Sequence, residues 1–108
     1  MSTIYAVNQN RWAKLGILDQ MGNIYSEVGR SFKSKDQKDH DAAVTRAIDL
    51  FDSTVKGLVK QRSPRAKEVL RAKEQFLAIV SDSNSTKESI ESLDRYFMQF
   101  AIAARINR

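Results

Sequence analysis

The stretch KGLVKQRSPRAKEVLRAK, residues 56–73, decides the fold, because one helical pattern ends and another begins at its Ser63-Pro64 step. Proline is well placed at the first position of a helix, and serine is well placed at the capping position before it. A helix should therefore start at this step. We interpret the stretch as the central turn of a helical bundle.

This turn is also the most basic part of the chain. It holds seven of the eighteen Lys and Arg residues and a single acid, Glu68. Lys60 and Arg62 close one helix, where cations suit the negative end of the helix dipole. Arg65 and Lys67 open the next helix and oppose its positive end, at a cost of roughly a few tenths of a kcal/mol each. Helix stability does not explain these two cations, which makes them candidates for binding.

Composition limits the class of protein. With 108 residues, the chain is long enough for one domain with one hydrophobic core. It has no cysteine, which excludes disulfides and cysteine nucleophiles and fits a reducing cytoplasm. Its apolar runs are far shorter than the ~20 residues that cross a bilayer, and the N-terminus lacks a signal-peptide pattern, so we expect a cytoplasmic protein with no membrane partner. The net charge of +5 favours polyanionic or acidic partners.

Apolar residues recur every three or four positions in four segments, which is the pattern of amphipathic helices. Polar stretches such as KSKDQKDHD (33–41) and SDSNS (81–85) separate these segments. Four amphipathic helices with short connections favour antiparallel neighbours, so we predict an all-α fold, an up-down-up-down antiparallel four-helix bundle. The predicted parts are an N-terminal lead-in over residues 1–10 and a bundle over residues 11–108, with helices at about 11–33, 39–62, 64–81 and 86–106.

Capping residues support two of the predicted helix starts. Asp36 and Asp39 are each placed to cap the second helix. Ser85, with Glu88 three residues later, forms a capping-box pattern before the fourth helix.

The predicted first helix contains Gly16, Gly22 and Gly29. A glycine in a helix interior costs up to about 1 kcal/mol relative to alanine, and close approach of another helix is the ordinary reason for it. Gly22, Ser26 and Gly29 lie along one strip of small residues, which is able to seat a helix of the same chain or of another copy. We take this strip as a candidate protein interface.

The predicted topology brings the start of the first helix, the central turn and the end of the fourth helix to one end of the bundle. Nine cations against one acid, Glu68, give this end a net charge of +8. A helix N-terminus beside Lys and Arg side chains binds phosphate well, because dipole, N–H donors and charge act on the same anion. The cations of this basic pole are Arg11, Lys14, Lys56, Lys60, Arg62, Arg65, Lys67, Arg105 and Arg108.

The basic pole points to nucleic acid without base readout. The chain has no zinc-finger spacing, no aromatic signature of an RNA-recognition motif and no recognition-helix pair, so contact should be with phosphate backbone and shape. The sequence does not distinguish RNA from DNA. The expected phosphate contacts are Lys60, Arg62, Arg65 and Lys67, with Arg11, Lys14, Arg105 and Arg108 as further binding residues.

Aromatic residues near the C-terminus have two interpretations. Phe97 and Phe100 fall on the inward stripe of the fourth helix, which favours packing over a role as a stacking platform. Tyr96 and Met98 lie off that stripe and are candidates for contact with a protein partner or a second protomer. Trp12 is either a lid over the end of the core or a contact aromatic at the basic pole.

Catalytic and metal-binding patterns are missing from the chain. His40 is the only histidine and lies in a charged turn, where we expect it to be solvated. Asp49 and Asp52 should lie on a polar stripe and pair with Arg46 at helical spacing. There is no Glu-x-x-His pair for a di-iron site, no Walker loop, no dinucleotide fingerprint and no nucleophile elbow. We therefore expect no enzyme activity, cofactor or metal.

Four segments carry a resemblance to known proteins. They are MGNIYSEVGR (21–30), AAVTRAIDLFDSTV (42–55), RAKEVLRAKEQF (65–76) and ESLDRYFMQFAIAAR (91–105). In this order they resemble a family of small uncharacterised bacterial helical-bundle proteins with an SEVxR segment, an LDLT-like segment and a terminal YFxxFAxAAR. As a short basic bundle, the chain is also similar in character to the accessory variability determinant of diversity-generating retroelements, a reverse-transcriptase partner that binds nucleic acid. It resembles, equally loosely, helical small subunits of CRISPR effectors and helical HEPN partners of nucleotidyltransferases, whose Arg-x4-6-His motif it lacks.

These observations predict a non-enzymatic accessory module. Its basic pole would dock on RNA or DNA backbone within a larger nucleoprotein complex, for example with a reverse transcriptase, so a larger protein partner is expected. The alternative is a protein-protein adaptor or a homo-oligomeric structural protein that does not bind nucleic acid.

Overall fold

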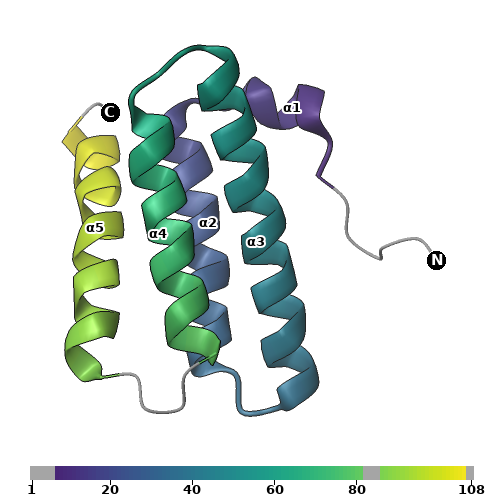
Figure 1. Ribbon diagram of the computed structural model, residues 1–108, viewed down its shortest axis with the longest axis vertical. Coiled ribbons are helices and arrows are strands. Elements are labelled where there is room, and N and C mark those ends of the chain that lie inside the picture. The colour runs from purple at the N-terminus through teal and green to yellow at the C-terminus, as the bar shows by residue number, and fades with distance from the viewer. Residues whose placement is uncertain (1–6, 82–85, 107–108) are drawn as a thin grey trace.

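The computed structural model describes residues 7–81 and 86–106, and over these residues the chain is helical. The all-α prediction is therefore confirmed. Figure 1 shows the four long helices side by side, with the shortest helix against the end of α3. The helices are α1 (Gln9–Ala13), α2 (Ile17–Lys33), α3 (Gln37–Lys60), α4 (Arg65–Ser81) and α5 (Lys87–Ile106).

The long helices place their connections at two ends of the molecule. The α3–α4 turn, α1 and the C-terminal end of α5 lie at one end (Figure 1). The α2–α3 connection and the start of α5 lie at the opposite end. No helix over the described residues is long and apolar enough to cross a membrane.

The single helix expected over residues 11–33 is two helices, α1 and α2. The break falls at Lys14–Gly16, and Gly16 adopts an extended conformation at the N-cap of α2. The side-chain amide of Gln20 donates hydrogen bonds to the carbonyls of Trp12 (3.2 Å) and Leu15 (3.0 Å). These two bonds tie the end of α1 to the first turn of α2, so the break is stable without a continuous helix.

Hydrogen bonds at the other helix starts identify the capping residues. Asp36 caps α3, since its carboxylate accepts from the Lys38 backbone N–H at 2.9 Å. At the start of α5 the Thr86 hydroxyl accepts from the Ser89 N–H at 3.1 Å. The predicted cap Ser85 lies outside the described residues.

The core lies where α2, α3, α4 and α5 meet. Phe51, Phe76 and Phe97 are fully buried. Phe51 contacts both of the other rings, with ring centres 6.0 and 6.1 Å apart. Each such side chain contributes about 1.5–3 kcal/mol through burial, so residues from three different helices stabilise one core.

The explanation of the glycine strip by a helix of the same chain is wrong. A Cβ added at Gly22 or Gly29 would meet no atom within 4 Å, and Ser26 is exposed. No neighbouring helix therefore requires glycine at these positions. Contact of the strip with another copy stays a prediction.

Two predictions about polar residues are also wrong. His40 is half-buried rather than solvated, and its Nδ1 lies 2.8 Å from the carbonyl oxygen of Ser31. Arg46 does not pair along its own helix. It contacts Glu27 on α2 at 3.2 Å, so this ion pair joins two helices. Sequence spacing cannot reveal such a pair, because it depends on which helices are neighbours.

Candidate nucleic-acid interface

The candidate site begins at the end of α3, where the chain makes an unusual turn. The Arg62 N–H donates to the Val59 carbonyl at 3.0 Å, and the Ser63 N–H donates to the Leu58 carbonyl at 2.9 Å. This pair of bonds is the Schellman motif, in which the residue at the Arg62 position adopts a left-handed conformation. Arg62 has φ = 57°. No other non-glycine residue in the described part of the chain has a positive φ. Glycine is the usual residue there, because a side chain in this conformation costs roughly 1–2 kcal/mol.

The next step of the turn starts α4. The Ser63 hydroxyl accepts from the Arg65 backbone N–H at 3.2 Å, so Ser63 caps the helix as predicted. Pro64 follows in the position where its missing N–H is harmless. Arg65 and Lys67 therefore do lie in the first turn of α4, against the positive end of the helix dipole.

An aromatic ring of α5 helps to hold Arg65. Its guanidinium carbon lies 6.0 Å from the centre of the Phe100 ring, within the range of a cation–π contact. Because this contact uses one face of the guanidinium, its N–H groups stay available to an anion. This pair leaves no signal in the sequence, since it joins residues 35 positions apart in the chain.

Tyr96 lies beside this pair and is packed rather than free. Its ring contacts Phe97 and Phe100 with centre distances of 5.6 and 5.3 Å. Its hydroxyl oxygen is buried and has no hydrogen-bond partner among the described residues. Burial, together with the charge of Glu68, raises the pKa of Tyr96 to about 12, while the charge of Arg65 acts in the opposite direction. The expectation that Tyr96 lies off the packed face is therefore wrong.

Trp12 brings the N-terminal cations to the end of α3. Its side chain is buried, and its indole N–H donates to the Thr54 hydroxyl at 3.0 Å. The interpretation of Trp12 as a lid over the core is thus confirmed. This contact holds α1 at the same end of the molecule as the α3–α4 turn (Figure 1). Arg11 lies within α1, and Lys14 is its C-cap residue.

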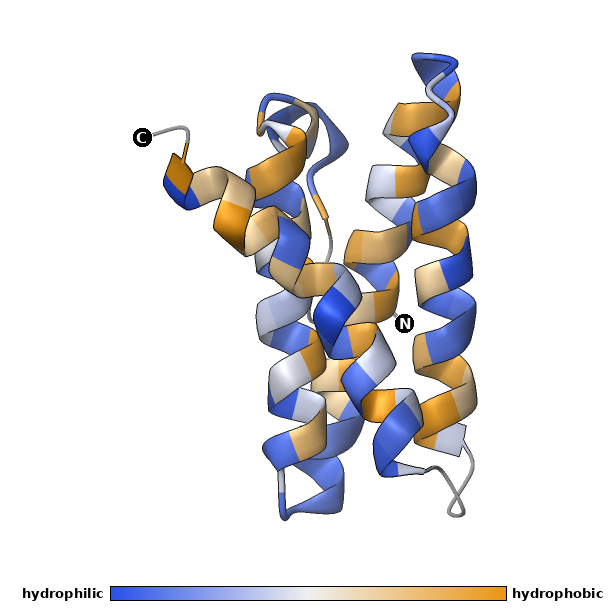
Figure 2. Ribbon diagram, turned by 90° about the vertical axis from the view of Figure 1, so that its left-hand side faces the viewer, coloured by the Kyte–Doolittle hydropathy of each residue, from blue (hydrophilic) through white to orange (hydrophobic). Residues whose placement is uncertain are grey.

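The structure brings together most of the predicted basic pole. Lys60, Arg62, Arg65 and Lys67 are exposed on one turn, and among the described residues none of them forms an ion pair with a carboxylate. Figure 2 shows that the C-terminal end of α5, which carries Arg105, leans away from that turn. The pole is therefore less concentrated than predicted. Arg108 lies outside the described residues.

The arrangement suits an anion better than a metal ion. The four exposed cations lie within eight residues around the N-terminus of α4, and cations beside a helix N-terminus are a favourable setting for phosphate. The described residues contain no group of three His, Asp or Glu side chains placed to hold a metal. No protein-family model, curated protein or solved structure matches the chain.

Proposed function

We propose that the protein is a non-enzymatic accessory module that binds the phosphate backbone of RNA or DNA through the α3–α4 turn. The observation that carries the proposal is Arg62 in a left-handed conformation. The turn keeps a cation where glycine would be more stable, and it adds Arg65 and Lys67 where the helix dipole disfavours them. Three departures from stability at one exposed turn are accounted for if their charge is used to bind an anion.

The proposal also covers the topology of the helical bundle and the larger complex in which the protein acts. We infer that α2 to α5 form an up-down-up-down antiparallel bundle, which is supported by the contacts of α2 with α3, α3 with α4, α4 with α5 and α2 with α5. Their connections also alternate between the two ends in Figure 1. A module of this size with one basic end suits a place within a larger nucleoprotein complex, such as one built on a reverse transcriptase.

Salt dependence tests the proposal directly. We expect fluorescently labelled duplex RNA or DNA to bind with a slope of log affinity against log salt of about −4 to −5, which corresponds to about five phosphates. The double variant Arg65→Glu, Lys67→Glu should reduce the magnitude of this slope by at least about 2. A slope near zero for the wild-type protein on both nucleic acids would disprove the proposal.

A matched control exists at the other end of the molecule. Lys35 and Lys38 flank the cap of α3 and are exposed, so Lys35→Glu, Lys38→Glu makes the same change of charge at another helix start. Binding should survive in this variant. Equal loss in both variants would show that the protein binds through its net charge and not through the α3–α4 turn.

The alternative function, a protein-protein adaptor or homo-oligomer, is favoured by a different observation. Met98 and Ile102 on α5 are exposed, at 38% and 49% of their full surface. The variant Arg65→Glu, Lys67→Glu separates the two functions. Loss of nucleic-acid binding with an unchanged solution mass supports the first function, whereas a wild-type protein that self-associates in solution and shows no salt-dependent binding of nucleic acid supports the second.

A further inference from the structure

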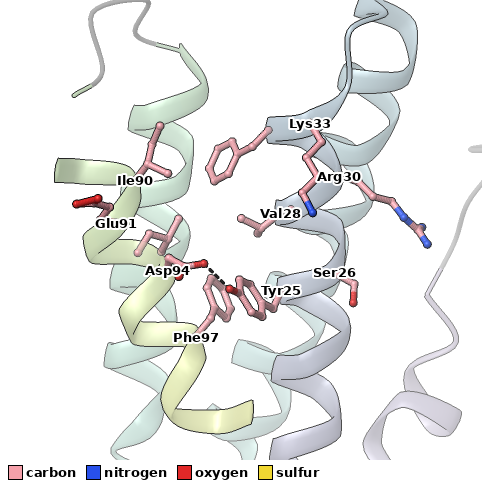
Figure 3. A pocket seen from close by; sticks show the side chains of 12 residues that line it. Tyr25, Ser26, Val28, Arg30, Lys33, Ile90, Glu91, Asp94 and Phe97 are labelled. Carbon is pink, nitrogen blue, oxygen red and sulfur yellow. Dashed lines mark hydrogen bonds between the residues drawn. The ribbon is translucent and has the colours of Figure 1, made fainter. Parts of the chain in front are cut away.

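A groove of about 630 Å³ runs between α2 and α5, away from the basic turn. Figure 3 shows Val28 on α2 and Ile90 on α5 on its two walls. The Tyr25 hydroxyl donates a hydrogen bond to Asp94 and bridges the two helices at one end of the groove. Gly29 lies on the α2 wall, where a side chain would meet nothing within 4 Å. The groove is thus apolar inside and open to solvent.

The surface of α5 beside this groove has its own apolar residues. Met98 and Ile102 are four residues apart, so they lie on one face of the helix, and both are exposed. Glu91 and Arg105 share this face, because each lies seven residues, or about two turns, from Met98. Glu91 also lines the groove. One strip of α5 therefore runs from the acid Glu91, between the exposed charges of Asp94 and Arg95, through two exposed apolar side chains, to the base Arg105.

We propose that this strip pairs with the same strip of a second copy, with the two α5 helices antiparallel and Met98 at the twofold axis. This arrangement places Glu91 of each copy opposite Arg105 of the other, twice by symmetry. Ile102 of the second copy then lies beside Asp94, over the open side of the groove next to Gly29. Exposed apolar area and opposite charges are buried together.

Charge fixes the direction of this pairing. A parallel pair about the same strip would place Glu91 against Glu91 and Arg105 against Arg105, which is repulsive at both ends. The antiparallel pair makes both contacts attractive. The strip is therefore complementary to itself in one direction only, which identifies a second copy as the partner. This pairing does not use the cations of the α3–α4 turn, and it is tested by solution mass without nucleic acid, so its failure is distinguishable from a failure of nucleic-acid binding.

Charge exchange tests the pairing. We expect the wild-type protein to be a dimer at high micromolar concentration in sedimentation velocity at low salt. Glu91→Arg alone and Arg105→Glu alone each convert two attractive contacts into two repulsive ones, and each should weaken the dimer by about tenfold or more. An equimolar mixture of the two variants should form a heterodimer, because every Arg then meets a Glu. The double variant Glu91→Arg, Arg105→Glu should dimerise again.

Each outcome decides the proposal. Glu74→Arg makes a matched change of charge on the exposed face of α4 and should leave the dimer unchanged. Circular dichroism of each variant shows whether it is folded, and only single variants that are folded are mixed. A wild-type protein that stays monomeric up to millimolar concentration overturns the pairing. It is also overturned by a dimer that persists in both single variants, or by single variants that fail to associate on mixing.

Discussion

The variant Arg62→Gly separates stability from binding at one residue. Arg62 is held at φ = 57° by the two backbone bonds of the Schellman motif, which do not involve its side chain. Replacing it with glycine removes the cost of a side chain in the left-handed conformation, roughly 1–2 kcal/mol. Glycine also adds freedom to the unfolded chain, which offsets roughly 0.4–1 kcal/mol of that gain.

The expected net effect is an increase of about 0.5–1 kcal/mol in the free energy of unfolding. For a domain of this size that corresponds to a rise of about 2–8 °C in Tm. Urea denaturation followed by circular dichroism measures the first quantity, and a thermal scan measures the second. The same variant removes one phosphate contact, so its salt slope for duplex binding should fall in magnitude by about 1.

Two further substitutions at Arg62 control for each effect. Arg62→Ala removes the charge but keeps a side chain in the left-handed conformation, so it should weaken binding without the gain in stability. Arg62→Lys should retain both the binding slope and the stability of the wild type. A glycine variant that is no more stable than the alanine variant would refute the conformational argument. A glycine variant with an unchanged salt slope would remove Arg62 from the interface.

Three other predictions concern polar side chains, of which Tyr96 and Thr54 are buried and Tyr25 makes an exposed hydrogen bond. Tyr96→Phe should raise the free energy of unfolding by about 1 kcal/mol, because it removes a buried hydroxyl that has no hydrogen-bond partner in the described part of the chain. A loss of stability in urea denaturation would contradict this prediction. Thr54→Val should lower the free energy of unfolding by about 1–3 kcal/mol, since it leaves the indole N–H of Trp12 buried and unpaired. Thr54→Ser keeps the hydroxyl and should lower it by less. Equal losses of stability in the two variants would show that the hydrogen bond is unimportant. The hydrogen bond with Asp94, aided by burial, raises the pKa of Tyr25 from 10.0 to about 12, so its contribution to stability is complete below pH 10 and is lost as pH rises to 12. Tyr25→Phe should therefore flatten the fall in Tm over this range relative to the wild type.

The helices were predictable because each follows a local rule. The apolar period located α3, α4 and α5 to within about two residues, and the Ser63-Pro64 step marked the start of α4. The break between α1 and α2 was not predictable from the period, since Ile17 and Leu18 continue it. Side-chain hydrogen bonds support that break, because the Gln20 amide donates to the carbonyls of Trp12 and Leu15.

The candidate site was predictable in its residues but not in its geometry. The excess of cations was visible in the sequence, whereas the left-handed conformation of Arg62 and the contact of Arg65 with Phe100 depend on the folded chain. Tyr96 is packed because the apolar face of α5 is wider than the stripe that Phe97 and Phe100 define in the sequence. The lean of α5, which separates Arg105 from the turn, follows from how whole helices pack and leaves no local signal.

The cations at the start of α4 make a last prediction, because they oppose the helix dipole whether or not an anion is bound. Arg65→Glu, Lys67→Glu replaces unfavourable charges by favourable ones, but it also removes the contact of Arg65 with Phe100, which is worth roughly 0.5–1 kcal/mol. The free variant should still be more stable than the wild type by about 1 kcal/mol at low salt, and the gain should shrink as salt screens it. Lys35→Glu, Lys38→Glu changes charge at another helix start and should gain comparable stability. Only the first variant should lose nucleic-acid binding. A loss of binding accompanied by a loss of stability would instead mean that these cations maintain the fold, and the proposed role of the turn would have to be abandoned.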